Sequence, residues 1–433
     1  MAPSDINVNV LEQCRVAPPP GSVSSKSLTL TFFDLYWLPF PGASECLFFF
    51  DYPHSTTHFM ECLLPSIKHS LSLTLVHFYP LAGSLSWQPL DSCKPAMINY
   101  VDGESAVSLT IAEFNNGGDH FHHLSGKLVR EVNASHLLAP PLSPSGSVVP
   151  TMALQITLFP NTGICLGITI HHAVADGRSA SHFIKSWASI CKGDAPLSKE
   201  YLPFFDRSVI KDPKGIEQIY LKQLEEFFKS TPAEKLEVIN NIPSTVVAPN
   251  MVRATFDLNR VSIEKLKELA QRPRHNNKDQ LTPLHPSTFS VTGAFVSICL
   301  IKAGCRYDML KLLVDCRARL KPPIPVVYFG NCVRGFDVVV EAWLSELLYR
   351  YLSGQKPKIK PIVLAGSPRF GFYQTDFGWG KPKKVELISI DATGALFLSE
   401  SRDGDGGVEI TLTLKEQEMD AFASIFVTSL NSL

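Results

Sequence analysis

The chain lacks long uninterrupted apolar segments and any surplus of charge of one sign. No stretch approaches the roughly 20 apolar residues of a membrane-spanning helix, and the longest apolar runs, such as Cys46 to Phe50, have the length of a strand. The 40 Lys and Arg are balanced by 41 Asp and Glu, which argues against a basic nucleic-acid-binding face or a polybasic membrane surface. Residues 1–20 carry charges and no apolar block, unlike a signal peptide. We therefore expect a cytoplasmic protein with no nucleic-acid and no membrane partner.

Cysteine pairs with CxxC spacing are also missing, although the chain has 10 cysteines. Their absence excludes a zinc knuckle and a redox dithiol, so we expect mostly buried free thiols. The composition is that of a folded protein, with 45% hydrophobic and 19% charged residues. A length of 433 residues exceeds the roughly 250–300 residues at which a single core stops growing. Two domains are therefore predicted.

Proline clusters mark the joints of the chain, and a polar stretch rich in Pro, Gly and Asp lies near its middle. We interpret residues 196–214 as a linker between a first domain, 1–195, and a second, 215–433. Strands are predicted over residues 28–33, 47–52, 152–158, 164–170, 385–391, 395–399 and 408–414, and helices over 57–73, 179–191, 216–228, 262–271, 288–303 and 415–431. Strands interleaved with helices in both halves predict the α/β or α+β class.

Residues 171–179 read His-His-Ala-Val-Ala-Asp-Gly-Arg-Ser, between an apolar strand and an amphipathic helix. Such a junction suits a reactive group because the flanking elements hold the loop in place. A neutral imidazole can accept a proton near neutral pH, since its unperturbed pKa is about 6.5. Because neighbouring residues of extended backbone point to opposite faces, one of His171 and His172 can enter a cleft while the other packs or meets solvent.

Other interpretations of this pattern remain open. His171, His172 and Asp176 could suggest a metal site, but no further ligand stands at a suitable spacing, and no metal is expected. Asp176 lies just before the predicted helix, where a carboxylate accepts backbone N–H bonds as a cap; that role is at least as well supported as catalysis. A second cluster lies in a stretch rich in Gly, Asn and Asp and is interpreted as a surface loop: His120, His122 and His123.

A further compact motif is formed by Asp376, Phe377, Gly378, Trp379 and Gly380. The two glycines allow a tight turn, and the two aromatic side chains can anchor that turn to a core. By itself the motif predicts a structural turn and no chemistry. A kinase-like interpretation of its first three residues fails because the chain has no Gly-rich loop before a Lys-bearing strand and no His-Arg-Asp.

With HxxxD at residues 172–176 and DFGWG at 376–380, in this order, the sequence resembles the BAHD acyl-CoA-dependent acyltransferases of plants. The resemblance covers nearly the whole chain. Residues 328–332, YFGNC, are similar to the subgroup that acylates sugars of flavonoid and other phenolic glucosides, often with malonyl-CoA. Further segments that resemble the family are 28–37, 77–83, 201–215, 287–292, 315–320 and 367–370.

The resemblance implies two similar-sized, chloramphenicol-acetyltransferase-like domains, each a mixed sheet with helices, with a channel between them. An acyl-CoA enters as co-substrate and a small glycoside as acceptor, and His172 removes the proton of the attacking hydroxyl. No cofactor is implied, because a thioester is already activated. Ser287, Thr288 and Thr292 match a segment near the pantetheine of coenzyme A. The resemblance makes DFGWG structural and remote from His172, and we expect a monomer.

Two charged residues beside the histidine receive specific predictions. Asp176 should turn away from His172 and pair with an arginine of residues 315–320, with Arg317 favoured, because a buried carboxylate needs a cationic partner. Arg178 is predicted to bind the free carboxylate of a malonyl group, for which a guanidinium fork is suited. A solvated arginine in the first helical turn is the equally weighted alternative.

One departure from the family concerns the second half. Only 34 residues lie between Cys332 and Ser367, whereas the family carries a longer segment with an additional strand and helix. Residues 333–366 are thus predicted to be shortened, leaving apolar side chains exposed or repacked: Val338, Val339, Trp343 and Leu344. The alternative function is an impaired paralogue that only binds metabolites or partners, and a lesser alternative is a hydroxycinnamoyl donor.

Overall fold

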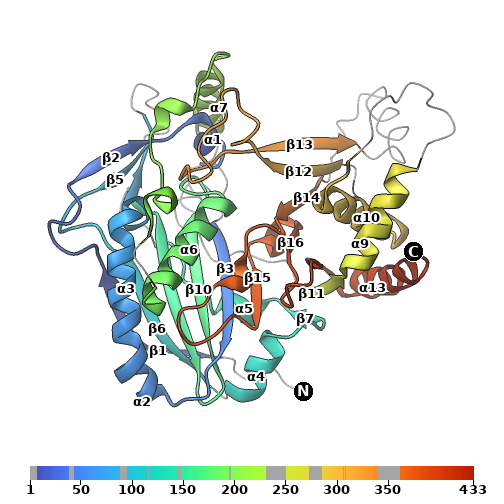
Figure 1. The fold of residues 1–433 in the computed structure, drawn as a ribbon, viewed down its shortest axis with the longest axis horizontal. Helices are drawn as coiled ribbons and strands as arrows, with labels where there is room; N and C mark the ends of the chain where they lie inside the picture. The colour runs from blue at the N-terminus through green and yellow to red at the C-terminus, as the bar shows by residue number, and fades with distance from the viewer. Residues whose placement is uncertain are drawn as a thin grey trace.

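In the computed structural model, two groups of helices and sheets lie side by side (Figure 1). It describes residues 7–38, 43–87, 95–115, 117–143, 148–194, 197–230, 250–272, 285–305, 307, 309–339 and 361–433. Within these residues, no helix is both long enough and apolar enough to cross a membrane. The cysteines of this part of the chain are free thiols, and most are buried.

The first sheet carries the His-His motif at the end of one of its central strands. Its order is β1 (Val8–Val16), β6 (Val107–Phe114), β9 (Met152–Phe159), β10 (Gly163–His171), β3 (Ala43–Asp51) and β15 (Lys384–Leu387). Helices α3 (Leu64–His77) and α6 (Gly177–Lys192) pack together and share one core with this sheet. A second apolar cluster involves Phe49, Phe121 and Cys165. Every residue of β9 and β10 is buried, as expected for strands covered on both faces.

The second sheet has seven strands and lies beside α9 (Arg260–Gln271), α10 (Thr288–Lys302) and α13 (Glu416–Asn431) (Figure 1). Its order is β13 (Val333–Val339), β12 (Met309–Asp315), β14 (Pro361–Gly366), β16 (Leu396–Glu400), β17 (Val408–Lys415), β11 (Met251–Leu258) and β7 (Arg130–Glu131). A small sheet is formed by β2 (Lys26–Thr29), β5 (Met97–Tyr100), β4 (Ser84–Ser86) and β8 (Val149–Pro150). These mixed sheets with helices confirm the predicted fold class.

The two halves of the chain exchange strands. Strand β7, from the first half, pairs with β11, and β15, from the second half, pairs with β3. At this junction Arg130 and Arg253 form ion pairs with Glu386, and Arg253 also pairs with Asp391. All four side chains are buried, so each charge needs its partner. A division of the chain at residues 196–214 therefore leaves one strand of each half in the other half's sheet.

Most predicted elements are present, with three corrections. The strand expected over 28–33 ends at Thr29, because Thr31 and Asp34 cap the short helix α1 (Phe32–Leu35). The strand expected over 385–391 ends at Leu387 and is followed by α12 (Ile390–Thr393). The histidines of residues 120–123 lie in helix α4 (Gly117–Leu124) and not in a loop. Buried Phe121 in this helix supplies the apolar anchor that a surface loop would lack.

The segment predicted to be shortened is described only in part. Strand β13 pairs with β12, so the described strands form one continuous second sheet up to that edge. Phe336 on β13 is 49% exposed to solvent. Trp343 and Leu344, predicted to lose their cover, lie outside the described residues, as do the side chains of Val338 and Val339.

Candidate active site

The His-His motif lies at the junction of β10 and α6. The side chain of Asp176 caps α6 by accepting a hydrogen bond of 2.9 Å from the Ser179 backbone N–H. His171 is buried at the end of β10, and its Nδ1 accepts a bond from the Ala173 N–H. Burial and the neighbouring His172 lower the pKa of His171 to about 4. The two histidines thus differ as predicted, since His171 packs inside whereas His172 lines a cavity.

The imidazole of His172 stacks on the indole of Trp37, with ring centroids 3.6 Å apart and planes inclined by 13°. Its Nδ1 is buried and makes no hydrogen bond within the described part of the chain. Asn331 Nδ2 donates to the His172 carbonyl oxygen at 2.8 Å. Burial lowers the pKa of His172, while its own backbone, Asp176 and Asn331 act in the opposite direction. The ring is therefore neutral at neutral pH and able to accept a proton.

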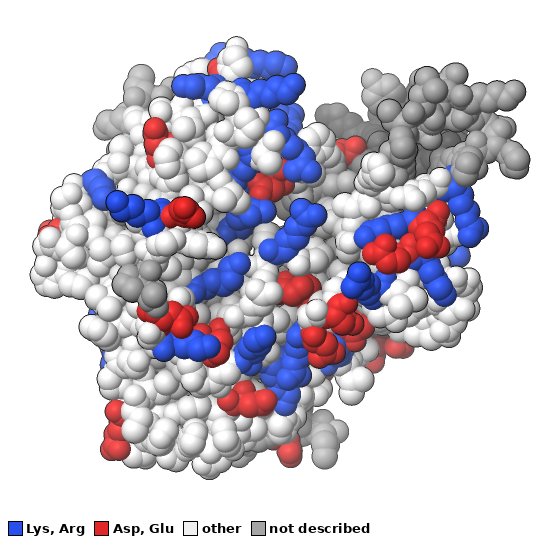
Figure 2. Space-filling view, viewed as in Figure 1, with Lys and Arg blue, Asp and Glu red and all other residues white. Residues whose placement is uncertain are grey.

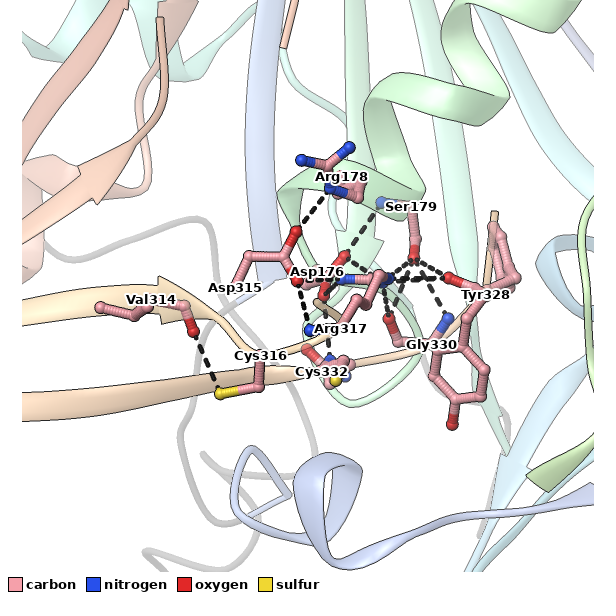
Figure 3. A network of polar contacts seen from close by, with 12 residues as sticks. Asp176, Arg178, Ser179, Val314, Asp315, Cys316, Arg317, Tyr328, Gly330 and Cys332 are labelled. Atoms are coloured by element: carbon pink, nitrogen blue, oxygen red, sulfur yellow. Dashed lines mark hydrogen bonds and ion pairs between the residues drawn. The ribbon is translucent and has the colours of Figure 1, made fainter. Parts of the chain in front are cut away.

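The expected ion pair between Asp176 and Arg317 is present (Figure 3). Arg317 Nη1 and Nη2 lie 2.8 and 3.1 Å from the two carboxylate oxygens, and the Cys332 backbone N–H donates to Asp176 at 3.0 Å. Burial alone would raise the pKa of Asp176, but Arg317 and these hydrogen bonds outweigh it and hold the pKa below its usual value. All these bonds turn the carboxylate toward its partners on the second half, as predicted.

Arg317 ties this carboxylate to the YFGNC segment. Its guanidinium also donates to the carbonyl oxygens of Tyr328 and Gly330. Ser179 donates to the Gly330 carbonyl from α6. Burial opposes the charge on Arg317, yet Asp176 raises its pKa. The loop after β10 is thus fastened to the second half through a buried, paired charge.

A cavity of about 920 Å³ opens beside His172 and is lined by both halves of the chain. It brings together the following predicted site residues: His172, Asp176, Arg178, Ser287 and Thr288. Ser287 caps α10 and Thr288 begins it. Thr292, one turn further, is fully buried and does not line the cavity.

The cavity wall carries several cations that the sequence analysis did not single out: Lys185, Arg319 and Arg369. Figure 2 shows Lys and Arg side chains along the middle of the viewed face, between the two halves of the molecule. Lys185 lies on α6, whereas Arg319 and Arg369 lie in turns of two segments that resemble the family. The same wall carries the carboxylates of Asp176, Asp315 and Glu400. Because Asp176 and Asp315 are already paired with Arg317 and Arg178, the remaining cations can attract an anionic ligand.

Arg178 has a carboxylate partner within the protein. Its Nε donates to Asp315 at 2.6 Å, and its side chain is 35% exposed. In Figure 3 the two terminal nitrogens of Arg178 point away from Asp315. The side chain is therefore held in place at the cavity wall and is not a freely solvated arginine.

The DFGWG segment lies apart from the cavity, which none of its five residues lines. Asp376 accepts bonds from the N–H groups of Gly378 and Gly380 and from Lys192 on α6. Phe377 is buried and stacks with Trp379 at 5.1 Å. Because this turn of the second half packs on the first core, we expect its role to be structural.

No group of three or more metal-ligating side chains occurs within the residues that the structure describes. The site combines a neutral histidine, a loop held by a buried ion pair, and a cavity whose wall carries several cations. Trp37 and Asn331 were not singled out individually, although both lie in segments that resemble the family. Their contacts with His172 join residues far apart in sequence, which spacing alone does not reveal.

Solved structures share this architecture. Vinorine synthase matches with a TM-score of 0.62 and 21% identity, over 96% of each chain. TRI101 of F. graminearum, solved with ethyl coenzyme A, matches with a TM-score of 0.64 and 12% identity, over 92% of this chain and 97% of that one. At these identities the likeness establishes the fold.

The family follows from sequence comparisons. The model of the Transferase family matches residues 6–360 and 342–428. Malonyl-CoA:anthocyanidin 5-O-glucoside-6''-O-malonyltransferase of Arabidopsis thaliana is 36% identical over 457 residues, covering 97% of each chain. Phenolic glucoside malonyltransferase 1 of the same plant is 35% identical, also over 97% of each chain. The chain belongs to this family, the BAHD acyl-CoA-dependent acyltransferases.

The comparisons also bear on the predicted shortening. The alignment with the first relative is longer than this chain of 433 residues, so that protein has residues with no counterpart here. The two family-model matches meet at residues 342–360, inside the segment 333–366. The alignment length does not locate the missing residues, whereas the overlap of the two matches is consistent with a deletion in that segment.

Proposed function

We propose that this protein transfers an acyl group from an acyl-CoA to a hydroxyl of a phenolic or flavonoid glucoside, with His172 as general base. The observation that carries the proposal is a neutral imidazole at the wall of a large cavity that both halves of the chain line. With Nδ1 buried, Nε2 is the nitrogen that remains to take the hydroxyl proton. The alkoxide attacks the thioester carbonyl, the C–S bond breaks, and the proton is returned to the coenzyme A thiolate.

Glucosides are favoured as acceptors by the relatives. Those named above are named for malonyl transfer to glucosides, and a coumaroyl-CoA:anthocyanidin 3-O-glucoside-6''-O-coumaroyltransferase is 37% identical over 96% of each chain. The acceptor class is common to all three names, whereas the acyl donor differs. We propose malonyl-CoA as the donor because Arg178 offers a positioned guanidinium at the cavity wall, suited to a free carboxylate. Coumaroyl-CoA is the second candidate.

The test is acyl transfer by the purified chain with malonyl-CoA, acetyl-CoA and coumaroyl-CoA and a panel of phenolic glucosides. The substitution His172→Ala should lower turnover by about 10²–10⁴-fold with no change in melting temperature. Arg178→Ala should reduce malonyl transfer by about one to two orders of magnitude and leave acetyl transfer unchanged. If malonyl transfer and acetyl transfer fell equally in Arg178→Ala, Arg178 would not select the acyl donor. Ligand binding without turnover in the parent would favour the impaired paralogue.

A further inference from the structure

Two segments that are far from His172 in the sequence hold it in place: the segment of α1 and Trp37, and the segment that contains Asn331. Trp37 follows α1, and its indole lies flat against the His172 ring. The fully buried Asp34 of α1 accepts bonds from the backbone N–H and the side-chain amide of Asn331, at 2.8 and 3.1 Å. The same amide donates to the His172 carbonyl. One buried chain of hydrogen bonds thus joins the segment that carries Trp37 to the backbone of His172.

We propose that Trp37 is a positioning residue for His172, holding the imidazole in one orientation and stabilising its protonated form during turnover. The inference rests on the proposed function, in which His172 becomes an imidazolium as the hydroxyl attacks. A cation over the face of an indole is attracted by the negative face of the ring, and the attraction grows when water is excluded. Contact at 3.6 Å and near-parallel planes provide that arrangement.

The titratable groups around His172 are either committed to other partners or neutral, so stabilisation of the imidazolium falls to the uncharged indole of Trp37. Asp176 raises the pKa of His172, but its carboxylate is committed to Arg317. Asp34, on the side of α1, is committed to Thr31 and Asn331. His171, the adjacent titratable group, has a pKa of about 4 and is neutral during turnover.

Three variants test the inference. Trp37→Leu removes the aromatic face, Trp37→Phe keeps a smaller one, and Trp87→Phe is the matched control because Trp87 is a partly buried tryptophan packed on Phe228. Trp37→Leu should lower kcat by roughly three- to thirty-fold with a smaller change in KM. Its acid limb of kcat/KM should move to lower pH, by up to about one unit. Trp37→Phe should recover part of both effects.

A readout without turnover separates this inference from the proposed function. Because an imidazolium quenches a stacked indole, the emission contributed by Trp37, measured as the parent minus Trp37→Phe, should titrate with the pKa of His172. In the His172→Ala background this emission should remain, but its pH dependence should vanish. If His172→Ala kept full turnover, the proposed function would fail, while the titration would still report the stack. A kcat of Trp37→Leu within two-fold of the parent, an acid limb that stays or moves to higher pH, or an equal loss in Trp87→Phe would overturn the positioning role.

Discussion

Replacing Asp176 by Asn tests how the catalytic loop is held. The carboxylate is 1% exposed and its partner Arg317 is 2% exposed. Asparagine can still cap α6, since its side-chain oxygen accepts as well, so the Ser179 bond is retained. The amide nitrogen, however, faces donors from Arg317 and Cys332 and leaves the guanidinium without its main counter-charge.

The magnitude follows from this geometry. Removing one partner of a buried ion pair costs about 3–5 kcal/mol. Arg317 keeps a contact of 3.1 Å with Asp315, which is 30% exposed and therefore a weaker partner. We expect Asp176→Asn to lower the free energy of unfolding by about 3–4 kcal/mol. Acyl transfer should fall as well, because the loop that carries His172 loses its ion pair with Arg317 of the second half.

The assay is urea denaturation followed by circular dichroism at several pH values. The pKa of Asp176 is lowered in the folded protein, so its stabilisation is present above the ordinary carboxyl pKa of about 3.9. It is lost only as the pH falls through the lower folded value. The free energy of unfolding of the parent should thus exceed that of Asp176→Asn throughout the neutral range, and the difference should disappear in acid.

A matched control is Asp376→Asn. Its ion pair involves Lys192, which is 45% exposed, and asparagine can still accept the bonds from Gly378 and Gly380. A cost below about 1 kcal/mol is expected for such an exposed pair. If Asp176→Asn destabilised the protein no more than this control at pH 7, the claim that a buried charge fastens the loop would be refuted.

Two further predictions concern the fold. Gly366→Ala should lower the unfolding free energy by at least about 1–2 kcal/mol, because Gly366 has φ +80° and an added Cβ would meet the Leu398 carbonyl; an unchanged urea midpoint would contradict this. His136 lies between two buried carboxylates, and although burial opposes its charge, they raise its pKa. Its stabilisation is therefore complete below pH about 6.5 and lost as the pH rises through the folded pKa. The stability gap between the parent and His136→Gln should be larger at pH 6 than at pH 9, and a constant gap would argue against a charged His136.

The sequence predicts best where local patterning and tertiary packing agree. Strands β9 and β10 were expected because they are apolar throughout, and they fill the centre of the first sheet. Helix α6 was expected from its apolar rhythm and begins at the expected cap, Asp176. The Asp176–Arg317 pair could be predicted because a buried carboxylate needs a cation and the family segment 315–320 offers one.

The features that the sequence does not predict depend mostly on contacts between residues far apart in the chain. Nothing near Trp37 indicates that it stacks on a residue of another segment, or that Asp34 bonds Asn331 from the other half. The strand exchange of β7 and β15 is likewise invisible, because each strand pairs with a neighbour far away in the chain. The family resemblance places Thr292 with Ser287 and Thr288 near the pantetheine, but the helical turn of α10 directs Thr292 into the core.

The position of the segment predicted to be shortened bears on whether the site is retained. Among the described residues, strand β13 is at one edge of the second sheet, opposite the edge where β7 enters from the first half. The chain entering β13 is fastened before the strand begins, since Asn331 is bonded to Asp34 and the Cys332 N–H to Asp176. The bonds that hold His172 and Asp176 involve no residue of the segment 333–366. We therefore expect the predicted deletion in that segment to affect the stability of the second sheet more than the catalytic loop.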